Sequence, residues 1–122
     1  VLGVKTLRLG WEWWHAHVVK SVEMDGIIAT NTTIDKSSLG SHPLAGEQGG
    51  LSGLPVREKS NQVLKMLTEH IDGELPIIGV GGIMNGKDAA DKIRLGATAV
   101  QVYSGMIYKG PALVKDCLAA LK

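Results

Sequence analysis

The stretch PIIGVGGI, residues 76–83, joins a short apolar run to a cluster of three glycines. Two other runs have the same character, GIIAT at 26–30 and ATAVQVY at 97–103. All three are rich in small and β-branched residues and lack a regular polar alternation. This composition is typical of strands that are covered on both faces, as in a parallel sheet. We therefore predict three parallel strands.

A long amphipathic stretch precedes the strand at 76–83. We predict a helix that begins at or just after Pro55 and ends at Asp72-Gly73, because its apolar residues recur at the spacing of one helix face. These residues are Val56, Val63, Leu64, Leu67 and Ile71.

Two more helices are predicted towards the C-terminus. The first runs from about Gly86 to Leu95, with Asn85 as its N-cap and Gly96 at the position that commonly ends a helix. The second follows Gly110-Pro111, since proline costs little in a first turn. Its apolar face consists of Leu113, Val114, Cys117, Leu118 and Leu121.

The resulting order of strands and helices predicts an α/β fold. Strands that alternate with helices imply right-handed crossovers and a parallel sheet. The loops that leave the strands then meet at one edge, the carboxyl ends of the strands. Ligands bind at this edge both in open α/β sheets and in (β/α)8 barrels.

Composition excludes several classes of function. The chain has 122 residues and a formal net charge of +1, without a basic run, so we expect no nucleic-acid surface. Its apolar stretches are shorter than the ~18 residues of a membrane helix, and no signal peptide is visible. The one cysteine cannot form an internal disulfide, which fits a reducing compartment.

The glycine clusters at 79–83 and 103–105 follow the last two predicted strands. Glycine allows backbone N–H groups to approach an anion closely, and a helix N-terminus adds partial positive charge. In (β/α)8 barrels the loops after the last two strands often bind phosphate. Tight turns are the alternative explanation. No GxGxxG or Walker pattern occurs, which disfavours a dinucleotide or nucleoside triphosphate site.

The connection from Thr30 to Pro55 is longer than most loops, and loops of this length are usually functional or disordered. It begins with Asn31 and Thr32, directly after a strand, and ends with the glycine cluster at 49–53. Amide and hydroxyl groups at this place can hydrogen-bond a polar ligand. We interpret the segment as an active-site loop.

Other polar side chains are predicted to be structural or solvated. His15 and His17 are two residues apart and face different sides of a helix, which argues against a metal pair. Cys117 lies on an apolar helix face and is expected to be inert packing. Surface positions are predicted for Ser37, Ser38, Ser41, His42, His70, Asp88 and Asp91.

Four segments in order closely resemble the class 2, quinone-dependent dihydroorotate dehydrogenases, from about Met24 to the C-terminus. The segments are DGIIATNTT at 25–33, GGLSG at 49–53, PIIGVGGI at 76–83 and VQVYSG at 100–105. The resemblance implies the C-terminal portion of a (β/α)8 TIM barrel, about three βα units, with FMN at the carboxyl ends of the strands. It implies oxidation of dihydroorotate to orotate in de novo pyrimidine (UMP) biosynthesis, with electrons passed to a quinone.

The resemblance also implies roles for individual residues. Asn31 and Thr32 match the contacts to orotate. Thr30, Gly53, Gly82, Tyr103 and Ser104 match the FMN contacts, the last three around its phosphate. The serine base of the family belongs to an earlier loop, so no catalytic residue is assigned in this chain, and no metal is expected. The family is peripherally associated with the cytoplasmic side of the inner membrane.

Residues 1–24 match the family poorly, whereas 25–122 match as the C-terminal part of the barrel. A strand that ends in a flavin-contacting lysine is expected before Asp25. VLGVK at 1–5 matches it weakly, but TLR at 6–8 does not continue the pattern, and three tryptophans crowd residues 11–14. We interpret residues 1 to about 20 as a frameshifted, mispredicted or otherwise altered piece; simple divergence is the alternative.

The chain is too short to be the whole enzyme. A partial barrel exposes strand edges that favour self-association, so we expect the isolated chain to be inactive and to bind FMN weakly or not at all. Two other interpretations stay open. The chain could belong to another FMN-dependent barrel oxidoreductase, or form a non-catalytic binding or assembly unit such as a half-barrel that dimerises.

Overall fold

A single parallel sheet organises the structure, a computed structural model that describes residues 4–7, 18, 21 and 24–122. Its strands stand side by side in chain order, and every neighbouring pair is parallel. This order is that of successive strands in a (β/α)8 barrel. The strands are β1 (Val4–Leu7), β2 (Gly26–Ala29), β3 (Ile77–Val80) and β4 (Ala99–Gln101).

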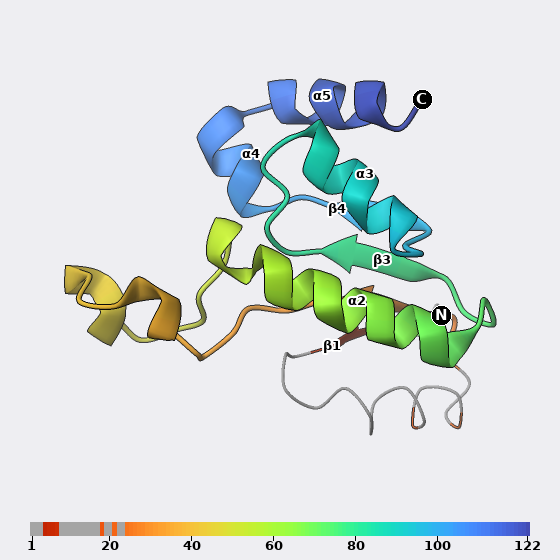
Figure 1. The fold of residues 1–122 in the computed structure, drawn as a ribbon, viewed down its shortest axis with the longest axis horizontal. Helices are drawn as coiled ribbons and strands as arrows, with labels where there is room; N and C mark the ends of the chain where they lie inside the picture. The colour runs from red at the N-terminus through yellow and green to blue at the C-terminus, as the bar shows by residue number, and fades with distance from the viewer. Residues whose placement is uncertain (1–3, 8–17, 19–20, 22–23) are drawn as a thin grey trace.

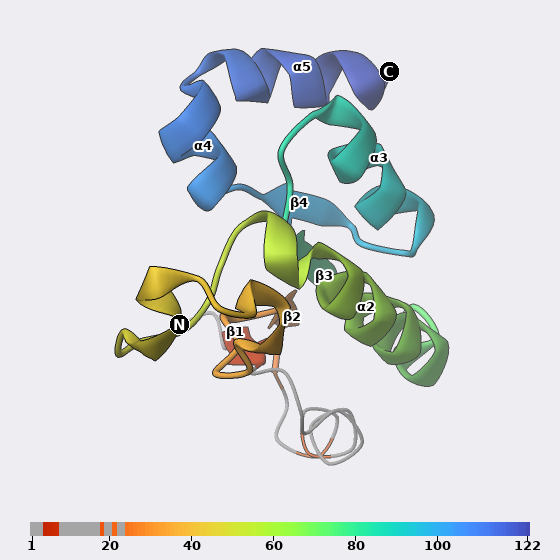
Figure 2. The same ribbon diagram turned by 60° about the vertical axis from the view of Figure 1, so that its left-hand side comes forward.

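The helices cover the sheet in two groups. In Figure 1, α2 runs alongside β3, and α3 and α5 lie together near β4. The arrow of β3 in Figure 1 points to the side of the molecule where α4 begins and where the long loop before α2 projects; Figure 2 shows this loop and α4 on the same side. The helices are α2 (Arg57–Ile71), α3 (Gly86–Arg94), α4 (Ser104–Lys109) and α5 (Ala112–Ala120).

The three predicted strands and the predicted helix before β3 are confirmed. All five apolar residues predicted for one face of that helix are buried. They belong mainly to a core between α2 and the sheet, because β2 and β3 present apolar side chains to the helix. This core consists of Ile27, Ala29, Val63, Leu64, Leu67, Ile71, Ile77 and Ala97.

The first strand extends further than the sequence pattern indicated. β1 includes Thr6 and Leu7, which pair with Ile28 and Ala29 of β2. The strand therefore continues through residues at which the resemblance had been lost. The paired histidines and the tryptophan-rich stretch of the sequence analysis lie outside the described residues.

The C-terminal helices differ in part from expectation. Asn85 caps α3 by accepting a hydrogen bond from the Asp88 N–H (2.9 Å), and Gly96 follows the helix with a φ of 100°, as predicted. Residues 104–109, for which no helix was predicted, form the short helix α4. Six residues are too few to show a helical repeat in the sequence.

The predicted apolar face of α5 is only partly buried. Leu113 and Cys117 pack in a second cluster with Ile83 and Ala89, which confirms Cys117 as a packing residue. Burial raises the pKa of its thiol, which keeps it protonated and unreactive. The other three predicted positions are exposed, because α5 packs on α3 and α4 and no other described element covers its outer side: Val114, Leu118 and Leu121.

The long loop after β2 is folded. Thr33 and Leu51 form an antiparallel bridge at its base through two backbone hydrogen bonds of 2.7 and 3.1 Å. Short 3-10 turns span Ser37–Leu39, Pro43–Gly46 and Leu54–Val56. The exposed positions predicted in this loop and at the end of α2 are confirmed for Ser37, Ser38, Ser41, His42 and His70.

Among the described residues, no helix combines the length and the apolar character needed to cross a membrane. The same part of the chain holds no group of three or more histidine, cysteine, aspartate or glutamate side chains that could bind a metal ion.

Candidate functional site

A pocket of about 400 Å³ lies where β2, β3 and β4 end. Its wall comes from the residues that directly follow the three strands and from the end of the long loop. The seven residues for which the sequence predicted ligand contacts all line it: Thr30, Asn31, Thr32, Gly53, Gly82, Tyr103 and Ser104. The structure thus brings the predicted site residues together, and their assignment to particular ligands stays a prediction.

The end of β2 contributes polar groups to the pocket. The Thr30 N–H donates to the Val80 carbonyl (3.1 Å), which ties the ends of β2 and β3 together. The Thr30 side chain is 4% exposed, and its hydroxyl has no hydrogen-bond partner among the described residues. A buried hydroxyl left without a partner is costly and points to a water or ligand that satisfies it.

Asn31 and Thr32 follow Thr30 and are both exposed on the pocket wall. The Asn31 side-chain oxygen accepts a hydrogen bond from the Thr32 N–H (2.7 Å). This contact orients the amide so that its nitrogen keeps two N–H donors for another group. The Thr32 hydroxyl adds a group that can both donate and accept.

The turn after β3 requires glycine at two successive positions. Gly81 and Gly82 have φ values of 107° and 75°, in the region that disfavours side chains. A Cβ on Gly82 would also lie 2.3 Å from the Arg57 Cβ, so this turn packs directly on the first turn of α2. Successive backbone N–H groups in such a turn form a concavity suited to an anion.

The glycine cluster of the long loop reaches the same place from a distant part of the sequence. The Ser52 and Ser104 hydroxyl oxygens are 2.9 Å apart and share a hydrogen bond. Gly53 has a φ of 75° and lies so close to Ser104 that a Cβ would be 3.4 Å from the Ser104 Cβ. Ser52 also lines the pocket and was missed by the sequence analysis, although its position beside Gly53 could have identified it.

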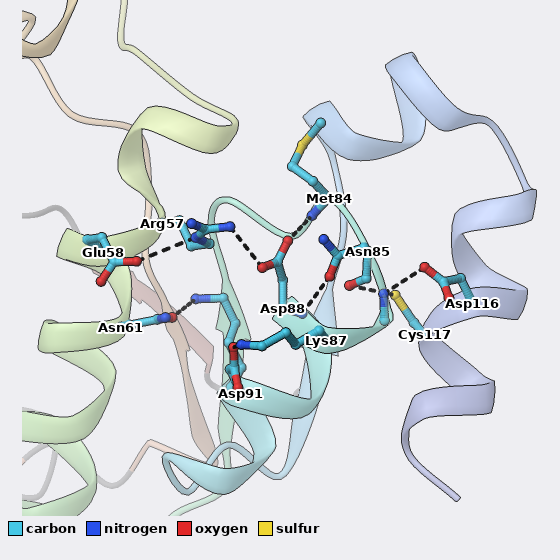
Figure 3. Close-up of polar contacts among 12 residues, drawn as sticks. Arg57, Glu58, Asn61, Met84, Asn85, Lys87, Asp88, Asp91, Asp116 and Cys117 are labelled. Carbon is cyan, nitrogen blue, oxygen red and sulfur yellow. Dashed lines mark hydrogen bonds and ion pairs between the residues drawn. The ribbon is translucent and has the colours of Figure 1, made fainter.

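The N-terminus of α3 has few backbone donors left for an anion, which weighs against the part that the sequence predicted for it. Three of these donors are already used within the protein (Figure 3). The Met84 N–H donates to Asp88 (2.9 Å), the Gly86 N–H to Asp116 (2.7 Å), and the Asp88 N–H to Asn85. An anion site at this edge would therefore rely mainly on the glycine turn and on the serine pair.

The prediction that Asp88 is solvated is wrong. Asp88 is 5% exposed and forms an ion pair with Arg57, 3.0 Å between the Asp88 oxygen and the guanidinium nitrogen (Figure 3). This pair joins α3 to the first turn of α2, the same turn on which Gly82 rests. Asp91 is half-buried and pairs with Lys87 and Arg94. The hydrogen bond from Lys87 is the main cause that lowers the pKa of Asp91.

Lys92 is completely buried, which the sequence analysis did not foresee. It lies on α3, one turn beyond Asp88, and its ammonium group bonds to side chains of α2. Burial lowers the pKa of Lys92 from 10.5 to about 8, and the negative charge of Asp88 opposes this shift.

This lowered pKa predicts how stability depends on pH. Below pH 8 both the folded and the unfolded protein hold the proton, so the full cost of the buried charge is present. Between pH 8 and 10.5 the folded protein loses the proton first, so the free energy of unfolding should rise with pH, by at most about 1.4 kcal/mol per pH unit. Urea unfolding of the protein and of Lys92→Met across this range measures the difference between them; a difference that is independent of pH would contradict the expectation.

A sequence model of the family described as Dihydroorotate dehydrogenase matches residues 12–122. The match begins inside residues 1–24, further towards the N-terminus than the motifs that carried the resemblance. The atypical character of that segment stays a prediction.

Several curated relatives are named dihydroorotate dehydrogenase (quinone). The protein from Neisseria meningitidis serogroup C (strain FAM18) is 89% identical over 106 residues, which cover 87% of this chain and 32% of the relative. The protein from Flavobacterium lutescens is 50% identical over 107 residues, 88% of this chain and 31% of the relative. This chain therefore spans about a third of the length of the curated relatives it matches.

Two solved structures also match this chain. The crystal structure of dihydroorotate dehydrogenase from Eimeria tenella in complex with ferulenol matches with a TM-score of 0.80 and 41% identity, over 87% of this chain and 28% of that chain. The ligand-free form from the same organism matches with a TM-score of 0.80 and 39% identity. The fold is thus a portion of the TIM barrel of these enzymes, and the chain belongs to the dihydroorotate dehydrogenase family.

Proposed function

We propose that this chain supplies the FMN-phosphate and orotate-binding part of a quinone-dependent dihydroorotate dehydrogenase. The complete enzyme would oxidise dihydroorotate to orotate in de novo pyrimidine biosynthesis. The observation that carries the proposal is the convergence of Thr30, the 49–53 cluster and the two later glycine loops on one pocket at the ends of three adjacent strands. Family membership supports the same function.

The groups around the pocket fit a flavin phosphate. The Gly81-Gly82 turn has no side chain that would block an anion, and backbone N–H groups in turns of this kind can bind one. The hydroxyls of Ser52 and Ser104 share one hydrogen bond, so the serine that accepts it can donate its own proton to a phosphate oxygen. The buried Thr30 hydroxyl, which lacks a protein partner, can bond to the flavin. FMN, when bound, supplies the hydride acceptor for the oxidation.

Asn31 and Thr32 are proposed to hold dihydroorotate and orotate. Both ligands carry a carboxylate and ring amide groups, which need donors and acceptors. The Asn31 amide nitrogen and the Thr32 hydroxyl provide these on the pocket wall, and the contact between the two residues holds them in place. We assign the proton-abstracting base to no residue of this chain.

The electron acceptor and the cellular location are also proposals. The matched relatives are named for a quinone. A quinone acceptor would place the complete enzyme at the cytoplasmic side of the inner membrane, as a peripheral protein.

A chimera provides the complete barrel needed to test binding. Residues Met24–Lys122 replace the corresponding segment of the meningococcal relative, with which the chain shares 89% identity. Dihydroorotate-dependent reduction of a soluble quinone at a rate within about threefold of the unaltered relative is expected. A chimera that folds and binds FMN but fails to oxidise dihydroorotate would contradict the proposed function.

In this chimera Asn31→Ala is expected to raise the dissociation constant of orotate roughly 10- to 100-fold, since hydrogen bonds to charged groups contribute about 1.5–3 kcal/mol. The affinity for FMN should stay unchanged. Titration of the flavin absorbance with orotate measures the first quantity. Ser38→Ala, an exposed position in the same loop, is the matched control and should change neither affinity. An unchanged orotate affinity in Asn31→Ala would remove this residue from the site.

A further inference from the structure

Lys92 is a buried charged residue that has no direct role in the proposed site. It does not line the pocket. Its aliphatic stem crosses β3, since a Cβ on Gly79 would lie 3.1 Å from the Lys92 Cδ. Its ammonium nitrogen ends 2.9 Å from the Ser60 hydroxyl oxygen and 2.9 Å from the Asn61 side-chain oxygen, both on α2. Burying a charge to this extent is costly unless the charge is hydrogen-bonded, so the two bonds to α2 are central to the role of Lys92.

Ser60 connects this ammonium group to the end of β3. The Ser60 hydroxyl donates to the Val80 carbonyl, the same oxygen that accepts the Thr30 N–H. Ser60 also touches the glycine turn, because a Cβ on Gly81 would lie 2.9 Å from its hydroxyl oxygen. The chain of contacts thus runs from Lys92 through Ser60 to Val80, directly before Gly81-Gly82.

The direction of these hydrogen bonds follows from the donors involved. A lysine side chain in its charged form donates only, so the Ser60 oxygen must accept from it. The Ser60 hydrogen is then left to point at Val80. Without Lys92 the hydroxyl can rotate towards other acceptors, and the bond that holds the Val80 carbonyl is no longer fixed.

We propose that Lys92 is a positioning residue for the anion-binding turn: through Ser60 it fixes the Val80 carbonyl and thereby the backbone N–H groups of Gly81 and Gly82. The inference rests on the proposed function, in which this turn holds the flavin phosphate. Arg57 supports the turn from the other side, since Gly82 packs on its backbone and Asp88 holds its guanidinium group. The Lys92 bridge differs in that it acts on the strand end before the turn.

The test uses Lys92→Met and Ser60→Ala in the chimera. Methionine keeps most of the length of the stem and removes the donor. Each variant is expected to raise the dissociation constant of FMN about tenfold, and the double variant no further than either single variant, because both changes break one chain of contacts. In the flavin-free protein, amide hydrogen exchange at Thr30, whose N–H donates to the Val80 carbonyl, should accelerate about tenfold in both variants, because that carbonyl is no longer fixed by Ser60.

Thr68→Val is the matched control. Thr68 also joins α2 to the segment after α3, through a 2.9 Å hydrogen bond to the Leu95 carbonyl, but at the far end of the helix. This variant should lower the free energy of unfolding without changing FMN affinity or exchange of the Thr30 amide. A purely structural role of Lys92 would make Lys92→Met behave in the same way as Thr68→Val.

Several outcomes overturn the inference. A folded Lys92→Met chimera with an FMN dissociation constant within about twofold of the parent and unchanged exchange of the Thr30 amide would refute it. If Lys92→Met does not fold, the same criteria apply to Ser60→Ala. If the parent chimera does not bind FMN, the proposed function fails, while exchange in the flavin-free variants still decides whether Lys92 orders the turn.

Discussion

No oxidation of dihydroorotate is expected from the purified 122-residue chain, and at most weak binding of FMN. A complete (β/α)8 barrel takes about 250 residues, and the sheet described here contains four strands in open order. β4 pairs with β3 alone among the described strands, and Ala99 and Gln101 are exposed on it. The pocket therefore lacks the walls that further strands would give it.

Turnover with dihydroorotate and a soluble quinone, together with size measurement in solution, tests this expectation. The open edge of β4 should make the chain self-associate, whereas the chimera closes the barrel and should be active. Activity of the isolated chain at a rate near that of the chimera would show that the remaining barrel is dispensable. It would contradict the proposal that this chain supplies only part of the active site.

Gly82→Ala is expected to have the largest effect of any single substitution at the site. The φ of 75° costs alanine roughly 1–2 kcal/mol. The added Cβ would lie 2.3 Å from the Arg57 Cβ and 2.5 Å from its Cα, and overpacking of this kind typically costs a further ~1–3 kcal/mol. The turn must move away from α2, so FMN affinity in the chimera should fall by roughly 100-fold or more.

Gly73→Ala is the control for the cost of the left-handed backbone conformation alone. Gly73 also has a left-handed φ, 78°, but a Cβ there would meet nothing within 4 Å, and the residue is remote from the pocket. This control should lose roughly 1–2 kcal/mol of unfolding free energy and keep its affinity for FMN. If Gly82→Ala stays folded and binds FMN as the parent does, the turn does not contact the phosphate.

Local patterns in the sequence were sufficient for most of the fold. The sequence shows directly the relations between residues that lie a few positions apart. These relations define the three apolar runs of β2, β3 and β4, the buried face of α2 and the Asn85 cap. The apolar face of α5 was overestimated, because its pattern shows which side chains could be buried but not how much of the face a neighbour covers. The length of strand β1 was underestimated, since its last two residues are identified by their pairing with β2 and not by the local pattern of the sequence.

The candidate site was predictable where it depends on strand order. Parallel strands bring Thr30, the 79–83 cluster and the 103–105 cluster to one edge whatever their spacing in the chain. Pairings between helices were not predictable. Asp88 and Lys92 look like ordinary charged residues of an exposed helix, and only the approach of α2 shows that they are buried. Contacts with side chains likewise occupy three backbone donors at the start of α3, which the sequence pattern does not show.

The most direct test of the central claim is a titration of the flavin-free chimera with FMN, followed by orotate. We expect an FMN dissociation constant within about threefold of that measured for the unaltered meningococcal protein, and a change in the flavin absorbance when orotate is added. A chimera that folds with the same unfolding free energy but binds neither ligand would contradict the claim that Met24–Lys122 carry the flavin-phosphate and orotate contacts.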